Sequence, residues 1–231
     1  MIERLAARYG KPETPPTSDP FELVLWENVA YLAPPARRRE AFELLVESVG
    51  TEPRTLLAAK PSALERVTAR GILKQTFAAK LRGCAKIAID EFGGDLRRAL
   101  PKPLDCAVRA LRSFPGIGEP GAEKILLFSG RQALLAPESN GLRVLVRLGL
   151  IEEQSSYART YAESRALNAG LGKVAFIQQA HLLLQKHGQT LCKRGAPLCS
   201  ECPLATACAY ARKNRPRARG KRGGGDERVR D

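Results

Sequence analysis

The chain has 231 residues, 44% of them hydrophobic and 27% charged, which suits one large or two small folded domains. No apolar run is long enough to cross a membrane, and the first eight residues lack the apolar region of a secretory signal. An integral membrane protein, a secreted disulfide scaffold and a wholly disordered chain are therefore not expected. Lys and Arg number 38 against 24 Asp and Glu, and the net charge of +14 favours a polyanionic partner.

The end of the chain carries much of this charge. From Arg212 to Asp231 there are nine basic and three acidic residues, a net +6, which leaves +8 on the rest. Because this stretch has almost no apolar side chains, we expect residues 211–231 to form a disordered basic tail. The tail is either a solubilising extension or a nonspecific phosphate-binding arm. The +8 elsewhere favours nucleic acid as the partner even without the tail.

From residue 21 to about 189 the apolar residues recur at helical spacing. A Pro-rich segment over 10–20 precedes a helix that begins near Phe21 and stops at Pro34 and Pro35, and a second helix ends at Gly50. Further helices are predicted over 72–92, 104–111, 119–128, 139–148, 157–169 and 173–187. There is no alternation of strands and helices, so the predicted fold class is all-α.

Four of the six cysteines are clustered in the order C-x6-C-x2-C-x5-C, at Cys192, Cys199, Cys202 and Cys208. Four thiolates within 17 residues of a chain without secretory features indicate a metal site rather than disulfides. Zinc and a [4Fe–4S] cluster both suit thiolate ligands, and the spacing favours the cluster. Cys84 and Cys106 are interpreted as core residues, and the only histidines, His181 and His187, as structural.

A short glycine-containing turn separates two predicted helices near the middle of the chain, at Pro115, Gly116, Ile117 and Gly118. Glycine lets the backbone turn tightly and approach another chain closely. The amides at the start of the following helix point outward with the positive end of the helix dipole behind them, which suits a phosphate. Such a turn is also an ordinary helix–helix link, but the basic charge and the cysteines favour phosphate binding.

These features occur together and in order, and the chain resembles the helix-hairpin-helix (HhH-GPD) DNA glycosylases of the endonuclease III and MutY family. The resemblance rests on FPGIGEPGAEKIL over 114–126, on ESNGLRVLVRLGL over 138–150, and on His181-Leu182-Leu183 leading into the cysteines. It covers roughly residues 20–210. The cysteine spacing is the one that this family uses for its [4Fe–4S] cluster.

The resemblance implies a six-helix barrel over 13–132 with the helix-hairpin-helix motif at about 105–128. It implies an iron–sulfur cluster domain formed by residues 1–12 and 133–210. The hairpin would lie at the cleft between them and hold a phosphate while the target nucleotide is turned out of the duplex.

The catalytic carboxylate of the family is an aspartate five residues before the Arg of its RV segment, and here that position is Glu138. In the family this group stabilises the oxocarbenium-like sugar and helps the attack of water or an amine. The side chain is one methylene longer in this chain, which puts its catalytic use in doubt. The alternative is that Glu138 is only an acid favoured at a helix N-terminus.

The bifunctional family members carry a nucleophilic lysine two residues after the second hairpin glycine, where this chain has Pro120. Proline suits the first turn of a helix but offers no amine. Lys124 lies one turn further along and is more simply a solvated helical lysine than a substitute. Lyase activity through the usual amine is therefore not expected.

Glu27 matches the glutamate that MutY-type glycosylases carry on their first barrel helix, where it protonates the departing base. Two carboxylates in unlike environments suit glycosidic cleavage, one neutral as an acid and one ionised. Glu27 is otherwise an exposed or capping acid. The glutamine pair that these enzymes use to fill the emptied stack is absent, and Tyr31 is the candidate to replace it.

We therefore expect a monofunctional DNA glycosylase of base excision repair, acting as a monomer on double-stranded DNA that contains a lesion or mismatch. Its expected location is cytoplasmic and nucleoid-associated. Two alternatives remain open: a catalytically silent DNA-binding member, and an abasic-site lyase that uses another amine.

Removal of residues 212–231 should flatten the salt dependence of DNA binding, because phosphate contacts by Lys and Arg set that slope. Single-turnover base release at low salt should stay nearly unchanged. Binding isotherms over a range of salt concentrations measure the slope. An unchanged slope would show that the tail is a solubilising extension.

Overall fold

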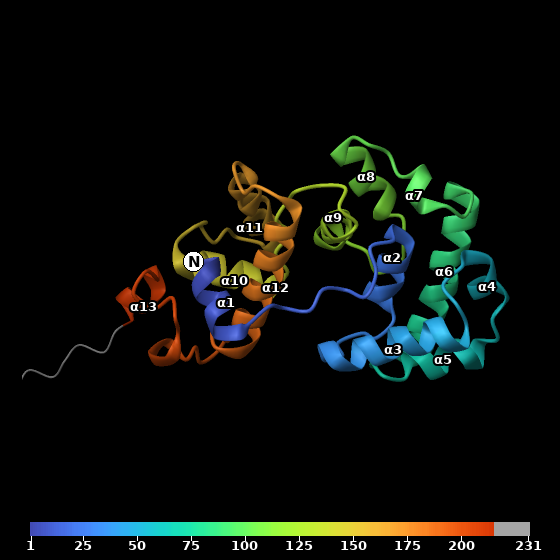
Figure 1. Ribbon diagram of the computed structural model, residues 1–231, viewed down its shortest axis with the longest axis horizontal. Coiled ribbons are helices and arrows are strands. Elements are labelled where there is room, and N and C mark those ends of the chain that lie inside the picture. The colour runs from blue at the N-terminus through green and yellow to red at the C-terminus, as the bar shows by residue number, and fades with distance from the viewer. Residues whose placement is uncertain (215–231) are drawn as a thin grey trace, which may run out of the picture.

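The computed structural model describes residues 1–214, and the rest of the basic tail lies outside the described residues. Within this range the chain forms helices and turns and no strand, so the predicted all-α class is confirmed (Figure 1). Figure 1 shows two lobes with one helix, α9, between them. The domain boundaries given above stay a prediction.

One lobe holds seven consecutive helices, of which the long α6 packs against α2, α4 and α5. Their bounds are α2 (Pro20–Asn28), α3 (Pro35–Ser48), α4 (Pro53–Ala58), α5 (Pro61–Thr68), α6 (Lys74–Phe92), α7 (Leu96–Ala99) and α8 (Leu104–Leu111).

The other lobe joins the N-terminal helix to the C-terminal part of the chain, because α1 packs on α12. Its helices are α1 (Ile2–Tyr9), α10 (Ser139–Leu148), α11 (Tyr157–Ser164), the 3-10 turn η1 (Arg165–Asn168), α12 (Val174–Thr190), the 3-10 turn η2 (Cys199–Glu201) and α13 (Ala209–Lys213). The chain therefore crosses between the lobes twice, at residues 10–19 and again after α9.

Helix α9 (Glu119–Phe128) packs against α2 and α8 on one side and α12 on the other. Its last four residues and Ala122 are buried, and so is the charged residue Glu123. A single hydrophobic core runs through both lobes by way of this helix. The side chains and backbone amides of α9 are therefore held at a fixed place between the lobes.

Local sequence signals explain several helix ends. Asp19 accepts hydrogen bonds from the amides of Phe21 and Glu22, and Pro20 occupies the first turn of α2. At the other end of two helices, Gly93 and Gly149 adopt φ of +62° and +81°, which ends α6 and α10 in the left-handed region.

The first predicted helix ends earlier than expected, at Asn28 rather than before Pro34. The reason is tertiary: the carbonyl of Tyr31 accepts a hydrogen bond from the amide of Ile72 at 3.1 Å, so this segment pairs with the chain that precedes α6. Helices α1, α4, α5, α7 and α13 were not predicted. Helix α13 includes residues 211–213, which the sequence assigns to the tail.

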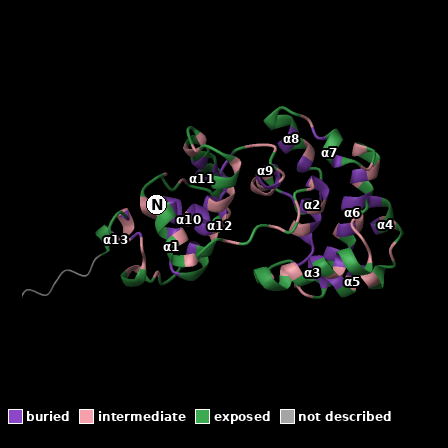
Figure 2. Ribbon diagram, in the orientation of Figure 1, coloured by how far each residue is buried: buried purple, intermediate pink, exposed green. Residues whose placement is uncertain are grey.

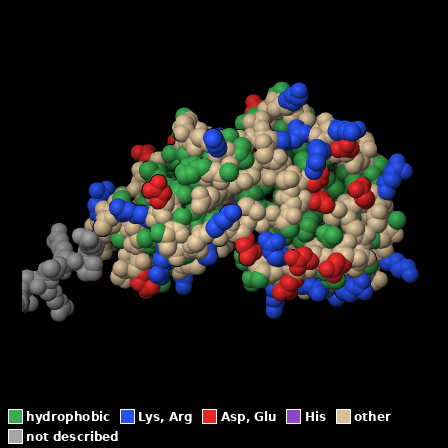
Figure 3. Space-filling view, in the orientation of Figure 1, with side chains coloured by type: hydrophobic (Ala, Val, Ile, Leu, Met, Phe, Trp, Pro, Cys, Tyr) green, Lys and Arg blue, Asp and Glu red, His purple; other side chains and the backbone are tan. Residues whose placement is uncertain are grey.

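Buried residues line the contacts between helices in each lobe, and exposed residues cover the outer faces (Figure 2). On the face shown in Figure 3, acidic side chains gather around the lower edge near α3, while Lys and Arg are spread around the rim. The positive charge is thus not gathered on this face. No helix of the described residues is long and apolar enough to span a membrane.

Candidate active site

The glycine turn between α8 and α9 has the geometry of a tight hairpin. Gly116 has φ +80°, and a Cβ there would lie 2.5 Å from Oδ1 of Asn28, the last residue of α2. A larger residue is therefore strained by its conformation and would displace the Asn28 side chain. Ile117 is buried and fixes the turn to the core, whereas Gly116 and Gly118 are exposed.

The start of α9 offers free hydrogen-bond donors. Within the described residues the amides of Gly118, Glu119 and Gly121 meet no protein acceptor, and Pro120 has no N–H to offer. These amides point away from the helix at the positive end of its dipole. The turn can therefore bind an anion such as a phosphate.

The loops that follow α2 and precede α6 expose apolar side chains. Leu32 and Leu73 are 70% and 59% exposed, and they are the two non-glycine residues with positive φ in the described chain. Backbone strain of this kind persists only where the surroundings impose it, and it gathers at functional sites. The loops meet closely at Gly71, where a Cβ would lie 2.5 Å from the Tyr31 amide nitrogen. Tyr31 itself stacks on Phe77 at 4.6 Å.

Glu138 is the N-cap of α10. One carboxylate oxygen accepts from the amide of Gly141 at 2.8 Å, and the other accepts from Nδ2 of Asn140 at 2.8 Å. Asn140 in turn accepts from Arg143, so the carboxylate is oriented by its own helix. The side chain is partly exposed and also lies near Tyr157, whose pKa rises because of burial and the Glu138 charge.

Lys124 and Glu27 form an ion pair that joins α9 to α2. Nζ of Lys124 lies 2.5 Å from Oε2 of Glu27, and each side chain is less than one-fifth exposed. Burial alone would raise the pKa of the Glu27 carboxyl, but the charges of Lys124 and Arg38 outweigh it and lower the pKa. Glu27 is therefore held as a carboxylate, which is the opposite of the state that a proton donor needs.

This pair lines a cavity of about 800 Å³ between the lobes. The walls come from α2, α3, α9 and α12, and the crossing segment at Lys11 to Pro15 covers one side. A cavity of this size can hold a base-sized ligand. Glu138 is not among the described residues that line it, so the two predicted catalytic carboxylates have different surroundings.

Two residues that line this cavity each have a buried nitrogen atom without a partner. Nδ1 of His181 and Nε of Arg38 are the buried side-chain polar atoms without a hydrogen bond among the described residues, and both residues line the cavity. Burial, with the nearby Lys124 charge, lowers the pKa of His181 to about 3, so its ring is neutral. Unsatisfied buried polar atoms are uncommon, so these two mark the wall of the cavity as a polar region.

A second charged network holds the opposite side of α9. Glu123 is almost fully buried and accepts hydrogen bonds from the hydroxyl of Tyr161 and, at 2.6 Å, from the guanidinium of Arg165. Arg165 also reaches Glu119 in the first turn of α9 at 2.5 Å. The helix that follows the hairpin is therefore fixed by ion pairs on two sides.

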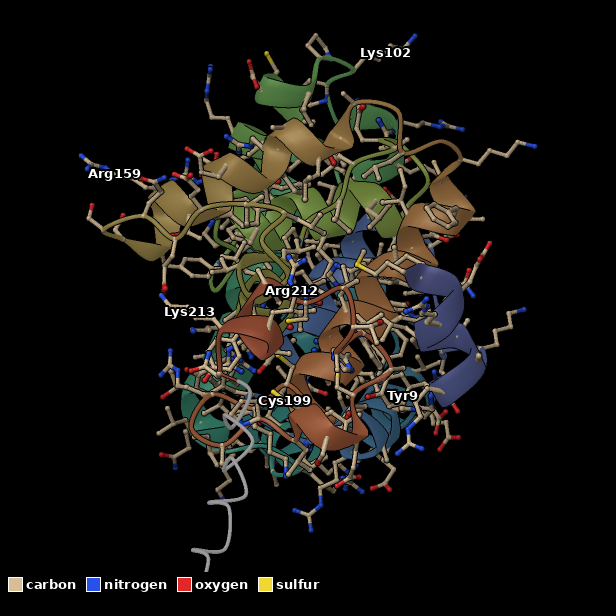
Figure 4. All side chains as sticks on the ribbon, turned by 90° about the vertical axis from the view of Figure 1, so that its left-hand side faces the viewer. Tyr9, Lys102, Arg159, Cys199, Arg212 and Lys213 are labelled. Atoms are coloured by element: carbon tan, nitrogen blue, oxygen red, sulfur yellow. The ribbon has the colours of Figure 1, made fainter. Side chains whose placement is uncertain are left out.

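The four clustered cysteines surround one small cavity that Arg147, His187 and Tyr210 also line. They come from the end of α12, from η2 and from the residue before α13, and Figure 4 shows Cys199 in the loops beneath α13. Burial, with the neighbouring cysteines, raises the pKa of the Cys202 thiol. No group of three or more His, Cys, Asp or Glu in residues 1–214 is arranged to hold a metal ion. An iron–sulfur cluster binds each thiolate through a different iron, and the four donors present fit it in kind and number.

Arg147 holds the segment that carries these cysteines. Its guanidinium donates to the carbonyls of Cys192, Lys193 and Arg194, and it lies 4.8 Å from the Tyr210 ring centre. On the other side of the cavity, His187 links the hydroxyl of Tyr9 at 2.9 Å to the Cys202 sulfur at 3.5 Å. The N-terminal helix is therefore tied to the cysteines through a histidine that the sequence identified only as structural.

Comparisons with known proteins bear on this arrangement. No family model matches the sequence. The chain is 25% identical over 217 residues to endonuclease III of Thermotoga maritima, covering 92% of this chain and 94% of that protein.

Solved structures share the fold over the same extent. The TM-score is 0.71 to an endonuclease III trapped as a covalent intermediate with DNA in an estranged-adenine complex, at 20% identity over 92% of this chain and 94% of that one. It is 0.74 to a thermostable thymine-DNA glycosylase, at 15% identity over 92% and 95%.

Similarity over nearly the whole length of both chains supports the endonuclease III-like helix-hairpin-helix superfamily. The family resemblance predicted from the hairpin, the RV segment and the cysteine spacing is thereby confirmed. In this endonuclease III-like protein the roles of Glu138, Glu27, the hairpin residues and the cysteines stay predictions.

Sequence reasoning missed the partners of α9. Residues 27 and 124 are 97 positions apart, and Glu123 and Arg165 are 42 apart, so no local pattern pairs them. A signal was present nonetheless, because Glu123 and Lys124 interrupt a helix that otherwise reads as buried. Adjacent charges in such a helix each need a partner.

Replacing Arg165 with Met should lower the free energy of unfolding by about 2–3 kcal/mol, because it leaves the buried Glu123 carboxylate with only the Tyr161 hydroxyl. Glu119→Gln removes the exposed arm of the same network and should cost about 0.5 kcal/mol or less. Urea unfolding of both variants measures the difference. Equal losses would contradict the role assigned to Glu123.

Proposed function

We propose that this protein is a DNA glycosylase that hydrolyses the N-glycosidic bond of a damaged or mismatched base in double-stranded DNA, the first step of base excision repair. The observation that carries the proposal is the kinship over nearly the whole chain with endonuclease III, together with an open hairpin at the start of α9. The neighbour trapped on DNA supports DNA as the partner. The protein is proposed to act as a monomer in the cytoplasm, at the nucleoid.

The hairpin would hold the backbone beside the target nucleotide. The free amides of Gly118, Glu119 and Gly121 are donors for one phosphate, and turning the nucleotide out of the duplex exposes its glycosidic bond. The exposed Leu32 and Leu73 are suited to fill the emptied stack, because apolar side chains inserted between bases replace lost stacking. Tyr31, which is stacked on Phe77, would support them.

Glu138 would act on the sugar. Its carboxylate is held by Gly141 and Asn140 at fixed geometry, so it can stabilise positive charge at C1′ and take a proton from the attacking water. The C1′–N bond breaks, the electron pair stays with the base, and the water oxygen bonds to C1′. Pro120 supplies no amine, so the reaction is proposed to end at the abasic site.

A [4Fe–4S] cluster is proposed on the four thiols of Cys192, Cys199, Cys202 and Cys208. When bound, such a cluster supplies structure by tying the last helix to the fold and shaping the basic loop that contains Lys193 and Arg194. Arg147 would hold that loop through its three carbonyl contacts.

Glu138→Gln should reduce single-turnover base release by about a hundredfold or more, because the amide can neither stabilise the cation nor take the proton. Glu138→Asp retains the charge and is the conservative comparison. Duplexes that carry uracil, a thymine–guanine mismatch, adenine opposite oxidised guanine, an oxidised pyrimidine or an alkylated purine are the substrates.

The outcomes of this experiment distinguish the proposed glycosylase from its two alternatives. Base release without borohydride trapping supports a monofunctional glycosylase, and trapping would show a lyase. Salt-dependent binding without release from any duplex would identify a silent DNA-binding member. Unchanged release by Glu138→Gln would overturn the role of that carboxylate.

Anaerobically purified protein should contain four irons and four sulfides per chain and absorb visible light. Cys199→Ser should lose iron and lower the melting temperature, because metal binding and folding are coupled. Cys106→Ser is the matched control, since Cys106 stands outside the quartet and is exposed, whereas the sequence interpretation wrongly placed it in the core. Zinc in place of iron in the wild-type protein would contradict the cluster.

A further inference from the structure

The floor of the cavity between the lobes combines a cation, an anion and unpaired polar atoms. Lys124 and Glu27 lie side by side with Nζ and Oε2 2.5 Å apart, and Arg38 and His181 each leave a buried nitrogen without a partner. Both residues line the cavity, whose volume is about 800 Å³. The Lys124–Glu27 pair therefore gives the cavity wall a hydrogen-bond donor directly beside an acceptor.

We propose that Lys124 and Glu27 are the base-recognition pair and that the cavity takes lactam bases, which leave as anions. Lys124 would donate to a carbonyl oxygen of the extruded base, and Glu27 would accept from the neighbouring ring N–H. This inference rests on the proposed glycosylase function and names its substrate class: uracil, thymine and their oxidised derivatives, rather than adenine or alkylated purines.

The hydrogen-bond pattern supports this class. A lactam presents an N–H donor directly beside a C=O acceptor, and an ammonium beside a carboxylate presents the complementary order. Both protein groups are mostly withdrawn from water, so their hydrogen bonds to a base are strengthened. A site that relies on such bonds rejects ligands that leave its buried groups unpaired.

The charges favour departure of the base as an anion. When the C1′–N bond breaks, the electron pair of that bond goes to the base and spreads onto its carbonyl oxygen, next to the Lys124 ammonium. The released proton of the attacking water goes to Glu138, and the base anion takes a proton from solvent afterwards. Adenine leaves best when it is first protonated, and the cavity supplies no suitable acid. An alkylated purine that is already cationic needs no acid, but the charges of Lys124 and Arg38 outnumber that of Glu27, and the net positive charge disfavours a cationic base.

The groups that could act as such an acid carry no proton that they can readily donate. Glu27 faces Lys124 and Arg38, whose charges lower its pKa, and His181 is neutral because burial lowers its pKa to about 3. Lys124 held in an ion pair is also a poor nucleophile, which argues against its use as a substitute for the missing hairpin lysine.

The first test measures which bases are released. Single-turnover assays on duplexes that differ only in the target should show release of uracil, thymine from a mismatch, or an oxidised pyrimidine, and little release of adenine or 7-alkylguanine. Release of only adenine or alkylated purines would overturn the inference and leave the proposed glycosylase intact. Release of no base by any duplex would reject the proposed function itself.

The second test uses 5-substituted uracils whose N1–H acidity is graded. Lys124→Met should reduce the rate for uracil by about a hundredfold, as for loss of one preorganised donor to a developing oxyanion. The loss should shrink as the leaving base becomes more acidic, because a better leaving group needs less help. The slope of log rate against leaving-group acidity should therefore be steeper in the variant than in the wild type.

Two further variants serve as controls for the Lys124→Met result. Lys124→Met leaves Glu27 buried without its partner, so the double variant Glu27→Gln/Lys124→Met removes both charges and should retain the steeper slope. Lys86→Met is the matched control, since Lys86 forms an equally short but exposed pair with Asp90, and its slope should equal that of the wild type. A uniform loss across all uracils in the Lys124 variants would show a purely structural ion pair and would overturn the proposal.

Discussion

The structure depends on how the charges of α9 are satisfied. This helix lies between the lobes, and burying a charge there is costly unless it is paired. Glu123 is paired with Arg165 on the side of α11, and Lys124 is paired with Glu27 on the side of α2. Each pair joins α9 to a different lobe, so the rotation of the helix about its axis is fixed. The hairpin amides at its N-terminus are thereby aimed in one direction.

The same helix connects the proposed phosphate-binding amides to the cavity in which the base is proposed to bind. Its first turn presents free amides to a phosphate, and Lys124, one turn deeper, faces the cavity. A helical turn rises about 5.4 Å, so the two functions are separated by a distance comparable to that between a nucleotide's phosphate and its base. In the proposed chemistry, a phosphate bound at the hairpin would place the base about one helical turn away, where Lys124 and Glu27 lie.

The local features could be predicted from the sequence, whereas the contacts between distant segments could not. The helices over 104–111, 119–128 and 139–148 were predicted with the observed bounds, because apolar spacing and glycine or proline ends are local signals. The end of α2 was missed because the pairing of Tyr31 with Ile72 joins two loops 41 residues apart. The state of Glu27 was missed for the same reason, since its lowered pKa comes from charges on α3 and α9.

Two residues of α9, Pro120 and Lys124, are related in the chemistry we propose. A lysine at position 120 would attack the sugar and make a covalent bond, and proline there removes that route. Hydrolysis must then rely on stabilising the two charged fragments as the C1′–N bond breaks. Glu138 would stabilise the sugar cation, and Lys124 would stabilise the base anion. The chain thus carries its helix lysine where it can act on the leaving group rather than on the sugar.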